Sequence, residues 1–324
     1  MEYRLFGRTG MRVSVIGLGC GGFGGVGSPK ELFGKGEDEQ AAFQLMDRAL
    51  ELGINYFDTA NSYGGGASEE MIGSWLTARG VREQIVLSTK LFNAMSAEPN
   101  AVGLSRRAIL REVEASLRRL KTDHLDIYMT HAPDWDTPVE ETLRTMDDLV
   151  RSGKVRYIGC SNEPAWHVAR GLWASDRLGL ARWEGVQNEY NLLHRGAERE
   201  VLPLCADQGL AFTPFSPLAG GWLTGKYRPG EPPPAGSRMT LRPGPYEEFS
   251  NQPTYDAIER LRKAAGERGV ELAALALAWV IRSPRVTAAL VGPRRLEHFE
   301  PALGALAIQL SAEERDALSG PSIA

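Results

Sequence analysis

The sequence predicts one (β/α)8 barrel, the TIM barrel fold, over residues 1–324, with a long loop after the seventh strand and a short C-terminal helix. Three observations lead to this prediction. Short apolar runs typical of buried strands alternate with segments of helical periodicity. The alternation gives eight strand–helix units, and strands that are each followed by a helix form parallel sheets. No change in composition marks a linker, and 324 residues suit a barrel of this kind.

The competing architecture is an open, doubly wound sheet. It is disfavoured because eight evenly spaced units need no second domain. The glycine-rich stretch 19–27 follows the first apolar strand, as in a dinucleotide-binding fold, but that motif must open directly into a helix. Here the loop 26–36 intervenes before a helix near Asp38. We therefore expect the glycines to line a ligand pocket and this loop to border the substrate site.

The individual elements follow from periodicity and from turn residues. After a strand-like lead at 3–9, the expected strands are 13–19, 54–58, 85–90, 125–131, 157–162, 186–190, 210–215 and 288–291. The expected helices are 39–52, 68–79, 105–120 with Ser105 as its N-cap, 139–152, 164–177, 198–207, 255–268, 272–281, one from Arg295, and 312–318. A loop rich in proline and glycine, 216–253, separates the seventh strand from the next helix.

Composition narrows the possible functions. A formal net charge of −4 argues against a nucleic-acid partner. No stretch of eighteen apolar residues predicts a membrane span, and the first residues lack the apolar core of a signal peptide, so we expect a cytoplasmic protein. Cys20, Cys160 and Cys205 have no paired spacing, which predicts free thiols and no structural metal. The sequence is silent on oligomeric state.

Four polar residues fall at or just past the ends of adjacent strands. Asp58 ends the second strand and Tyr63 follows it, Lys90 ends the third, and His131 ends the fourth. Each has an ordinary structural interpretation: a helix cap, a surface phenol, a solvated cation or a core imidazole. Because strand ends of a barrel meet at one mouth, their joint arrival there favours a proton-transfer site.

The chemistry of such a site follows from its groups. A tyrosine phenol, with a pKa near ~10, is a reluctant acid at neutral pH. A neighbouring Lys90 would lower that pKa, and Asp58 would neutralise and orient the buried ammonium. His131 would hydrogen-bond the phenol or the substrate oxygen. The site would then protonate an oxyanion formed as a cofactor delivers hydride to a carbonyl.

This order of residues resembles the catalytic tetrad of the aldo-keto reductase superfamily. The likeness covers nearly the whole chain, from the Gly-Arg-Thr-Gly segment at residue 7 to Gly292. The motifs that carry it are 57–60 with Tyr63-Gly64, 159–162, 187–191, and 216–218 with 223–226. The resemblance implies that Tyr63 is the general acid, or the base in the oxidative direction, and that His131 orients the substrate.

The resemblance also implies a nicotinamide cofactor. Ser161, Asn162 and Gln187 would bind the carboxamide, and Phe215 would stack on the nicotinamide ring. The backbone near the pyrophosphate would come from Ser216, Pro217, Leu218, Gly220 and Gly221. The phosphates and the adenosine would be bound by Lys226, Arg238, Gly292, Arg294 and His298. Gly22, Phe23 and Asp58 are further candidate cofactor contacts. Because the planar guanidinium of Arg294 suits a 2′-phosphate, we expect NADPH rather than NADH.

Two parts of the chain depart from the family or vary within it. Where the family often has Gln and then Glu-Asn against adenine, this chain has His298, Pro301 and Ala302, which weakens the adenine end of the assignment. The substrate pocket is expected to be apolar or aromatic. Its expected lining is Phe23, Phe92, Trp135 and Trp222, with Tyr63 and His131 at its base.

The sequence thus predicts an NADPH-dependent reductase of a small aldehyde or ketone, able in principle to oxidise the alcohol. Two alternatives stay open. A barrel of this kind could bind the nicotinamide cofactor as a redox sensor or subunit with little turnover. It could also be an isomerase or lyase that uses no nicotinamide.

Overall fold

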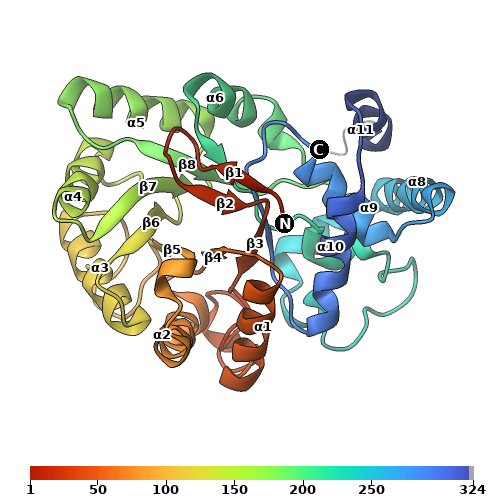
Figure 1. Cartoon of the computed structure of the whole chain (residues 1–324), viewed down its shortest axis with the longest axis horizontal. Coiled ribbons are helices and arrows are strands. Elements are labelled where there is room, and N and C mark those ends of the chain that lie inside the picture. Colours follow the sequence, from red (N-terminus) through yellow and green to blue (C-terminus); the bar gives the residue numbers. More distant parts are fainter. Residues whose placement is uncertain (321–324) are drawn as a thin grey trace.

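The computed structural model describes residues 1–320 and forms a parallel sheet of eight strands, shown in Figure 1. The strands lie in the order β10-β3-β4-β5-β6-β7-β8-β9. Their bounds are β3 (Ile16–Gly19), β4 (Tyr56–Asp58), β5 (Val86–Leu91), β6 (Leu125–Thr130), β7 (Val155–Ser161), β8 (Trp183–Gln187), β9 (Ala211–Phe212) and β10 (Ala289–Val291). The predicted (β/α)8 fold is confirmed.

The last strand closes the sheet against the first seven. The Leu290 amide donates to the Pro214 carbonyl at 2.9 Å, and the Thr287 amide donates to the Phe212 carbonyl at 2.8 Å. On its other side, β10 pairs in parallel with β3. These two backbone hydrogen bonds join the outer strands and close the sheet into a barrel.

Helices alternate with the strands and cover the outside of the sheet (Figure 1). They are α1 (Glu39–Glu51), α2 (Ala67–Arg79), α3 (Arg106–Leu120), α4 (Val139–Arg151), α5 (Ala165–Leu178), α6 (Val201–Gln208), α8 (Gln252–Arg268), α9 (Leu272–Ile281), α10 (Glu300–Ala307) and α11 (Ala312–Ser319). Ser105 caps α3 by accepting a hydrogen bond from the Ala108 amide, as its sequence position predicts. No helix within residues 1–320 has the length and apolar character needed to cross a bilayer.

The N-terminal segment forms a hairpin that the sequence did not predict. β1 (Tyr3–Leu5) pairs antiparallel with β2 (Arg12–Ser14), so the expected strand 13–19 is split. The split occurs because the Ser14 amide donates to the Asn55 side chain at 2.7 Å instead of continuing into the sheet. Phe6 and Val13 of this hairpin pack with inward residues of the barrel such as Tyr56 and Met129. In Figure 1 the red hairpin lies across the ring of strands.

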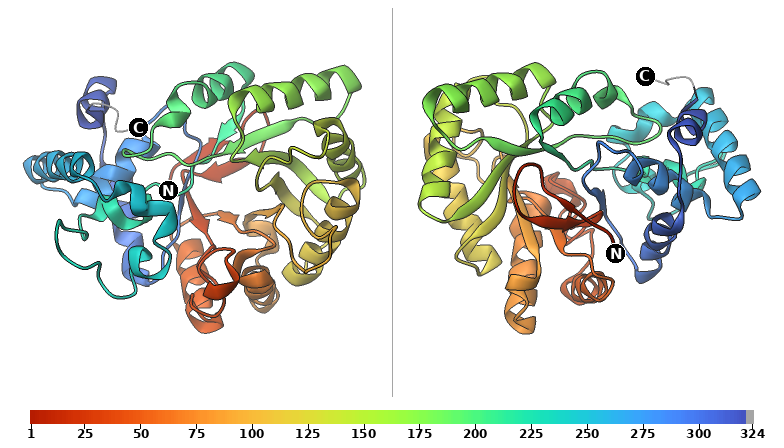
Figure 2. Two further views of the ribbon diagram at one scale, coloured as in Figure 1. Left: turned by 180° about the vertical axis from the view of Figure 1, so that it is seen from behind. Right: turned by 45° about the horizontal axis from the view of Figure 1, so that its top comes forward.

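The opposite end of the barrel carries the long connections. The first, 26–36, contains one helical turn, η1 (Lys30–Leu32), and is fixed by the hydrogen bond from the Gly34 amide to the Gly24 carbonyl, at 2.8 Å. The second, 216–253, was expected to be a plain loop but holds the short helices η5 (Ala219–Thr224), α7 (Arg238–Leu241) and η6 (Gly244–Phe249). In Figure 2 this teal segment lies on the side of the barrel that carries α8.

Candidate active site

The four strand-end residues come together at one mouth of the barrel. Asp58 is the last residue of β4, Lys90 lies in β5, and His131 directly follows β6. Tyr63 begins η2 (Tyr63–Gly66), a turn after β4 in which Gly64 and Gly65 adopt positive φ angles of 58° and 70°. These left-handed conformations favour glycine and turn the chain so that Tyr63 faces the mouth.

Lys90 is a fully buried cation with two partners. Its Nζ atom lies 2.6 Å from Asp58 Oδ2 and donates to the Thr59 carbonyl at 2.7 Å. The second oxygen of Asp58 accepts a hydrogen bond from Gln187 Nε2 at 3.0 Å. Burial alone would lower the pKa of Lys90, but the Asp58 carboxylate raises it above its ordinary value. The ammonium therefore stays charged inside the barrel.

Tyr63 faces both Lys90 and His131. Its hydroxyl lies 3.5 Å from His131 Nε2, and the two rings meet edge to face with centroids 5.5 Å apart. The Lys90 Nζ atom is 5.2 Å from the centroid of the Tyr63 ring. Both residues are half-buried, so part of each remains accessible to a ligand. A phenol, an imidazole and an ammonium thus share a single small site.

The electrostatics of this site differ in one respect from the sequence-based expectation. Burial raises the pKa of Tyr63 above its ordinary value and outweighs the lowering effect of Lys90. Burial, followed by the charges of Lys90 and Arg242, lowers the pKa of His131 to about 3. At neutral pH the phenol therefore holds its proton and the imidazole is neutral. Such a pair can donate hydrogen bonds to a developing oxyanion.

The ends of β7 and β8 place three amide or hydroxyl side chains beside the tetrad. Ser161 Oγ donates to the Gln187 carbonyl at 2.7 Å, and Asn162 Nδ2 donates to the His131 carbonyl at 2.9 Å. Asn162 has a positive φ of 61°, a conformation that costs free energy in a residue other than glycine and is typical of ligand sites. The Gln187 amide is already used by Asp58. Of the three, Asn162 is the most available to a ligand.

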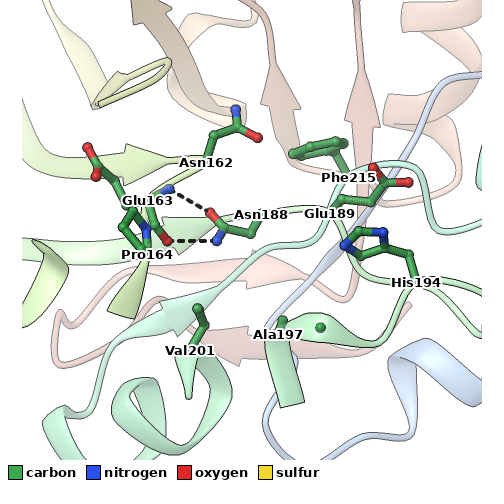
Figure 3. A pocket seen from close by; sticks show the side chains of 10 residues that line it. Asn162, Glu163, Pro164, Asn188, Glu189, His194, Ala197, Val201 and Phe215 are labelled. Atoms are coloured by element: carbon green, nitrogen blue, oxygen red, sulfur yellow. Dashed lines mark hydrogen bonds between the residues drawn. The ribbon is translucent and has the colours of Figure 1, made fainter. Parts of the chain in front are cut away.

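Phe215 lies at the edge of a pocket of about 400 Å³ next to these residues. Figure 3 shows Phe215, Glu189 and His194 along one side of the pocket and Asn188 with Glu163 along the other. Phe215 is half-buried, so one face of its ring can accept a flat ligand. Burial, with the nearby charge of Glu248, raises the pKa of Glu189 to about 7. Glu189 and His194 were not predicted as site residues.

The segment after β9 offers backbone N–H groups and positively charged side chains to a ligand. Ser216 and Ala219 have positive φ angles of 52° and 49°, and Gly220 and Gly221 follow with 62° and 96°. Successive backbone N–H groups in such turns make anion-binding concavities. Pro217 and Leu218 lie between the two strained residues.

Lys226 and Arg238 add two cations with no carboxylate partner among residues 1–320. Burial lowers the pKa of both side chains. The charges of Arg238, Arg294 and Arg295 lower the pKa of Lys226 further. The charges of Arg294 and Arg242 lower the pKa of Arg238, while Tyr246 and Glu37 oppose this effect. Cations that outnumber the nearby carboxylates repel one another and complement a ligand that carries several negative charges.

Arg294 is engaged by a carboxylate that the sequence did not predict. Its Nε atom lies 2.6 Å from Glu37 Oε1, and its Nη1 atom donates to the Gly236 carbonyl at 2.7 Å. The Arg294 amide donates to His298 Nδ1 at 3.1 Å. A Cβ atom at Gly22 would overlap the Glu37 carboxylate, so a side chain there would require that carboxylate to move. Gly292 is exposed just after β10, and Arg294 and His298 follow it in the same connection.

The four aromatic residues expected to line the substrate pocket separate into two groups. Phe92 is half-buried and Trp135 is 62% exposed, so both offer surface, and the Trp135 ring stacks on Trp166 with centroids 5.7 Å apart. Phe23 and Trp222 are buried, with 0% and 2% exposure, and as placed they offer almost none. Trp222 instead packs against Tyr227, with ring centroids 4.8 Å apart. The loop position alone did not reveal this because loop residues can turn inward as readily as outward.

Comparisons of the sequence with known proteins point to one family. The sequence model of the aldo/keto reductase family matches residues 15–320. An oxidoreductase of Bacillus subtilis (strain 168), named YrpG and uncharacterized, is 39% identical over 97% of this chain and 93% of its own. The versiconal hemiacetal acetate reductase of Aspergillus parasiticus is 33% identical over 100% of this chain and 97% of its own. A probable voltage-gated potassium channel subunit beta of Arabidopsis thaliana is 36% identical over 91% and 88%.

Proposed function

Because the chain belongs to the aldo/keto reductase family, we propose that it reduces an aldehyde or ketone to an alcohol, with NADPH as hydride donor and Tyr63 as proton donor. The observation that carries this proposal is the Tyr63 hydroxyl 3.5 Å from a neutral His131, beside a buried Lys90–Asp58 pair. This arrangement holds one acidic proton where a carbonyl oxygen can approach.

Each residue of the tetrad has a separate task in this mechanism. Tyr63 donates its proton to the carbonyl oxygen as negative charge develops there. Lys90 stabilises the tyrosinate that remains, since its charge opposes the effect of burial on the Tyr63 pKa. Asp58 keeps Lys90 charged and in place. His131, being neutral, donates one hydrogen bond from its ring N–H to the carbonyl oxygen and so holds that oxygen between itself and the phenol.

The proposed cofactor site extends along the residues that follow strands β7 to β10. Asn162 and Ser161 would hold the carboxamide, and Phe215 would stack on the ring. The backbone of 216–221 would bind the pyrophosphate. Lys226 and Arg238, which have no carboxylate partner in the described chain, would neutralise phosphates, and Arg294 would contact the 2′-phosphate by exchanging its bond to Glu37. When bound, the nicotinamide supplies the hydride.

The decisive experiment compares the wild type with Tyr63→Phe. We expect NADPH oxidation with a simple aldehyde such as benzaldehyde to fall by roughly 10²- to 10⁴-fold in the variant, because the proton donor is gone. NADPH binding, followed by quenching of protein fluorescence, should change little because the phenol is not part of the proposed cofactor wall. Equal turnover by the two proteins would contradict the proposal.

A second candidate function is a nicotinamide-binding subunit with little turnover. Two relatives that are 36% and 37% identical, from Arabidopsis thaliana and Oryza sativa subsp. japonica, carry the name of a probable channel subunit. Tight NADPH binding with negligible reduction of aldehydes, ketones and sugars would favour this function. The Tyr63 geometry favours the reductase, because a sensor has no need of a proton donor.

A further inference from the structure

Arg242 is a cation at the barrel mouth that no role above uses. It follows α7, its backbone amide donates to the Arg238 carbonyl at 2.8 Å, and its side chain is half-buried. Among residues 1–320, no carboxylate lies within ion-pair distance of the guanidinium and no side-chain hydrogen bond satisfies it. A half-buried charge without a partner loses hydration and gains nothing in return. The guanidinium of Arg242 is therefore free to bind an anionic ligand.

Its position is fixed by Gly27 of the first connection. A Cβ atom at Gly27 would overlap the guanidinium, so the side chain rests directly on the backbone there. Gly27 in turn accepts a hydrogen bond from the Gly64 amide at 3.0 Å and donates to the Gly21 carbonyl at 2.7 Å. Gly64 follows Tyr63, and a Cβ atom at Gly21 would lie 3.5 Å from the Tyr63 ring. Arg242 therefore stands on the wall that contacts the proposed proton donor.

The electrostatics agree with this placement. The charge of Arg242 is one of the influences that lower the pKa of His131, after burial and Lys90, and it also opposes the effect of burial on Tyr63. Its field thus reaches both groups that would hold a carbonyl oxygen. Arg242 also acts on Arg238, so it lies between the proposed phosphate site and the reacting centre.

Other side chains of the same wall are polar. Ser28 Oγ lies 2.8 Å from Ser62 Oγ, and Asn93 Nδ2 donates to Ser62 Oγ at 3.1 Å. Ser28 and Asn93 are half-buried, so both can also reach a ligand. The expected aromatic lining is weaker than predicted because Phe23 and Trp222 are buried. A guanidinium flanked by hydroxyl and amide groups complements an oxyanion better than a hydrocarbon.

We propose that Arg242 binds a carboxylate on the carbonyl substrate, so that the preferred substrates are small aldehydes or ketones carrying an acidic group. This inference rests on the proposed reductase function. The planar guanidinium can hold a carboxylate through two parallel hydrogen bonds while Tyr63 and His131 hold the carbonyl oxygen. A phosphate of the cofactor is also an anion that a guanidinium can bind, but Lys226 and Arg238 already provide cations for the cofactor phosphates.

The test uses two aldehydes that differ only in charge, 4-carboxybenzaldehyde and its methyl ester, with the wild type and Arg242→Gln. We expect the wild type to prefer the acid. In the variant, kcat/KM for the acid should fall roughly 10- to 100-fold, as for loss of a hydrogen bond to a charged group, while the value for the ester stays within about threefold. Arg107→Gln, which removes an exposed arginine of α3, should leave both values unchanged.

Two further measurements separate the possible outcomes. The dissociation constant of NADPH should be unchanged in Arg242→Gln and raised in Arg238→Gln. A raised constant in Arg242→Gln, with an unchanged ratio of acid to ester turnover, would assign Arg242 to the cofactor and overturn the inference. Binding of benzoate to the NADPH complex, followed by calorimetry, needs no turnover. If neither aldehyde reacts but benzoate binds only when Arg242 is present, the reductase proposal fails and the anion site stands.

Discussion

Lys90 and Asp58 are the residues on which the local chemistry depends. Burying an ammonium or a carboxylate alone is expensive, and the pair is tolerated because the two charges neutralise each other and each group has a further hydrogen-bond partner. Asp58 binds Lys90 through one oxygen and Gln187 through the other, and Lys90 also reaches the Thr59 carbonyl. The pair therefore delivers a fixed positive charge to Tyr63 without exposing it to water.

The protonation states of Tyr63 and His131 predict that kcat/KM depends only weakly on pH. A group with a raised pKa keeps its proton to higher pH, so Tyr63 remains a competent acid through the neutral range. A group with a lowered pKa stays neutral to lower pH, so His131, at about 3, takes up no proton there. We expect kcat/KM for carbonyl reduction to be constant from about pH 5 to about pH 9 and to fall only above about pH 10 as Tyr63 ionises.

The measurement is a pH profile of NADPH oxidation with a neutral aldehyde. A step near pH 6.5 would show that His131 titrates in its ordinary range and would contradict the burial argument. Glu189 is the control, because its pKa is raised to about 7 and it lines the pocket beside Phe215. A step near pH 7 that vanishes in Glu189→Gln would belong to that carboxylate and not to the tetrad.

For individual residues, the sequence predicts which ones lie at strand ends. It does not predict which residues of different loops contact one another. Asp58, Lys90 and His131 could be located because strand periodicity puts them at one end of the barrel. Glu37 and Arg294 are 257 positions apart, and no local pattern indicates their contact. Arg242 could not be identified either, since a loop arginine is usually solvated. Its burial depends on the backbone of Gly27 in another loop.

Among the elements, the hairpin β1–β2 closes the end of the barrel opposite the site. Phe6 is fully buried, and its ring meets Tyr56 edge to face with centroids 6.3 Å apart. The neighbouring Leu5 belongs to the same hairpin but is 47% exposed. Phe6→Ala should destabilise the protein by about 3–5 kcal/mol, whereas Leu5→Ala should cost less than about 1 kcal/mol.

Urea unfolding followed by circular dichroism measures this difference. Because the hairpin lies away from the mouth, the kcat/KM of folded Phe6→Ala should equal that of the wild type at a temperature where both are native. Similar unfolding midpoints for the two variants would show that the hairpin contributes little to the core.

Element boundaries differ in how well periodicity predicts them. The helix expected at 139–152 ends at Arg151, one residue before the expected end. This boundary was predicted closely because hydrophobic spacing and the following Gly153 both mark it. The strand expected at 13–19 was wrong because a single apolar run cannot reveal a change of partner. The short helices in 216–253 were missed for a related reason: their turns depend on tertiary contacts such as that between Ser216 and Tyr246, with oxygen atoms 3.2 Å apart.

For the whole molecule, the location of the charged residues affects the binding of anionic ligands more than the net charge does. The formal net charge is −4, yet the mouth carries Lys226, Arg238, Arg242 and Arg294 close enough to perturb one another. Glu37 pairs with one of them. A locally positive mouth on an acidic protein attracts an anionic cofactor or substrate to the site and disfavours its binding elsewhere on the surface.

This asymmetry predicts that salt weakens NADPH binding more than NADH binding. The two cofactors share the pyrophosphate, and only NADPH has the 2′-phosphate proposed to meet Arg294. Raising the salt from about 0.02 M to about 0.3 M shortens the screening length severalfold, so the dissociation constant of NADPH should rise more steeply than that of NADH. Both are followed by fluorescence quenching. In Arg294→Gln the two salt slopes should converge, because the additional charge contact is lost. Equal slopes in the wild type would mean that the 2′-phosphate stays in solvent, and that the preference for NADPH has another origin or does not exist.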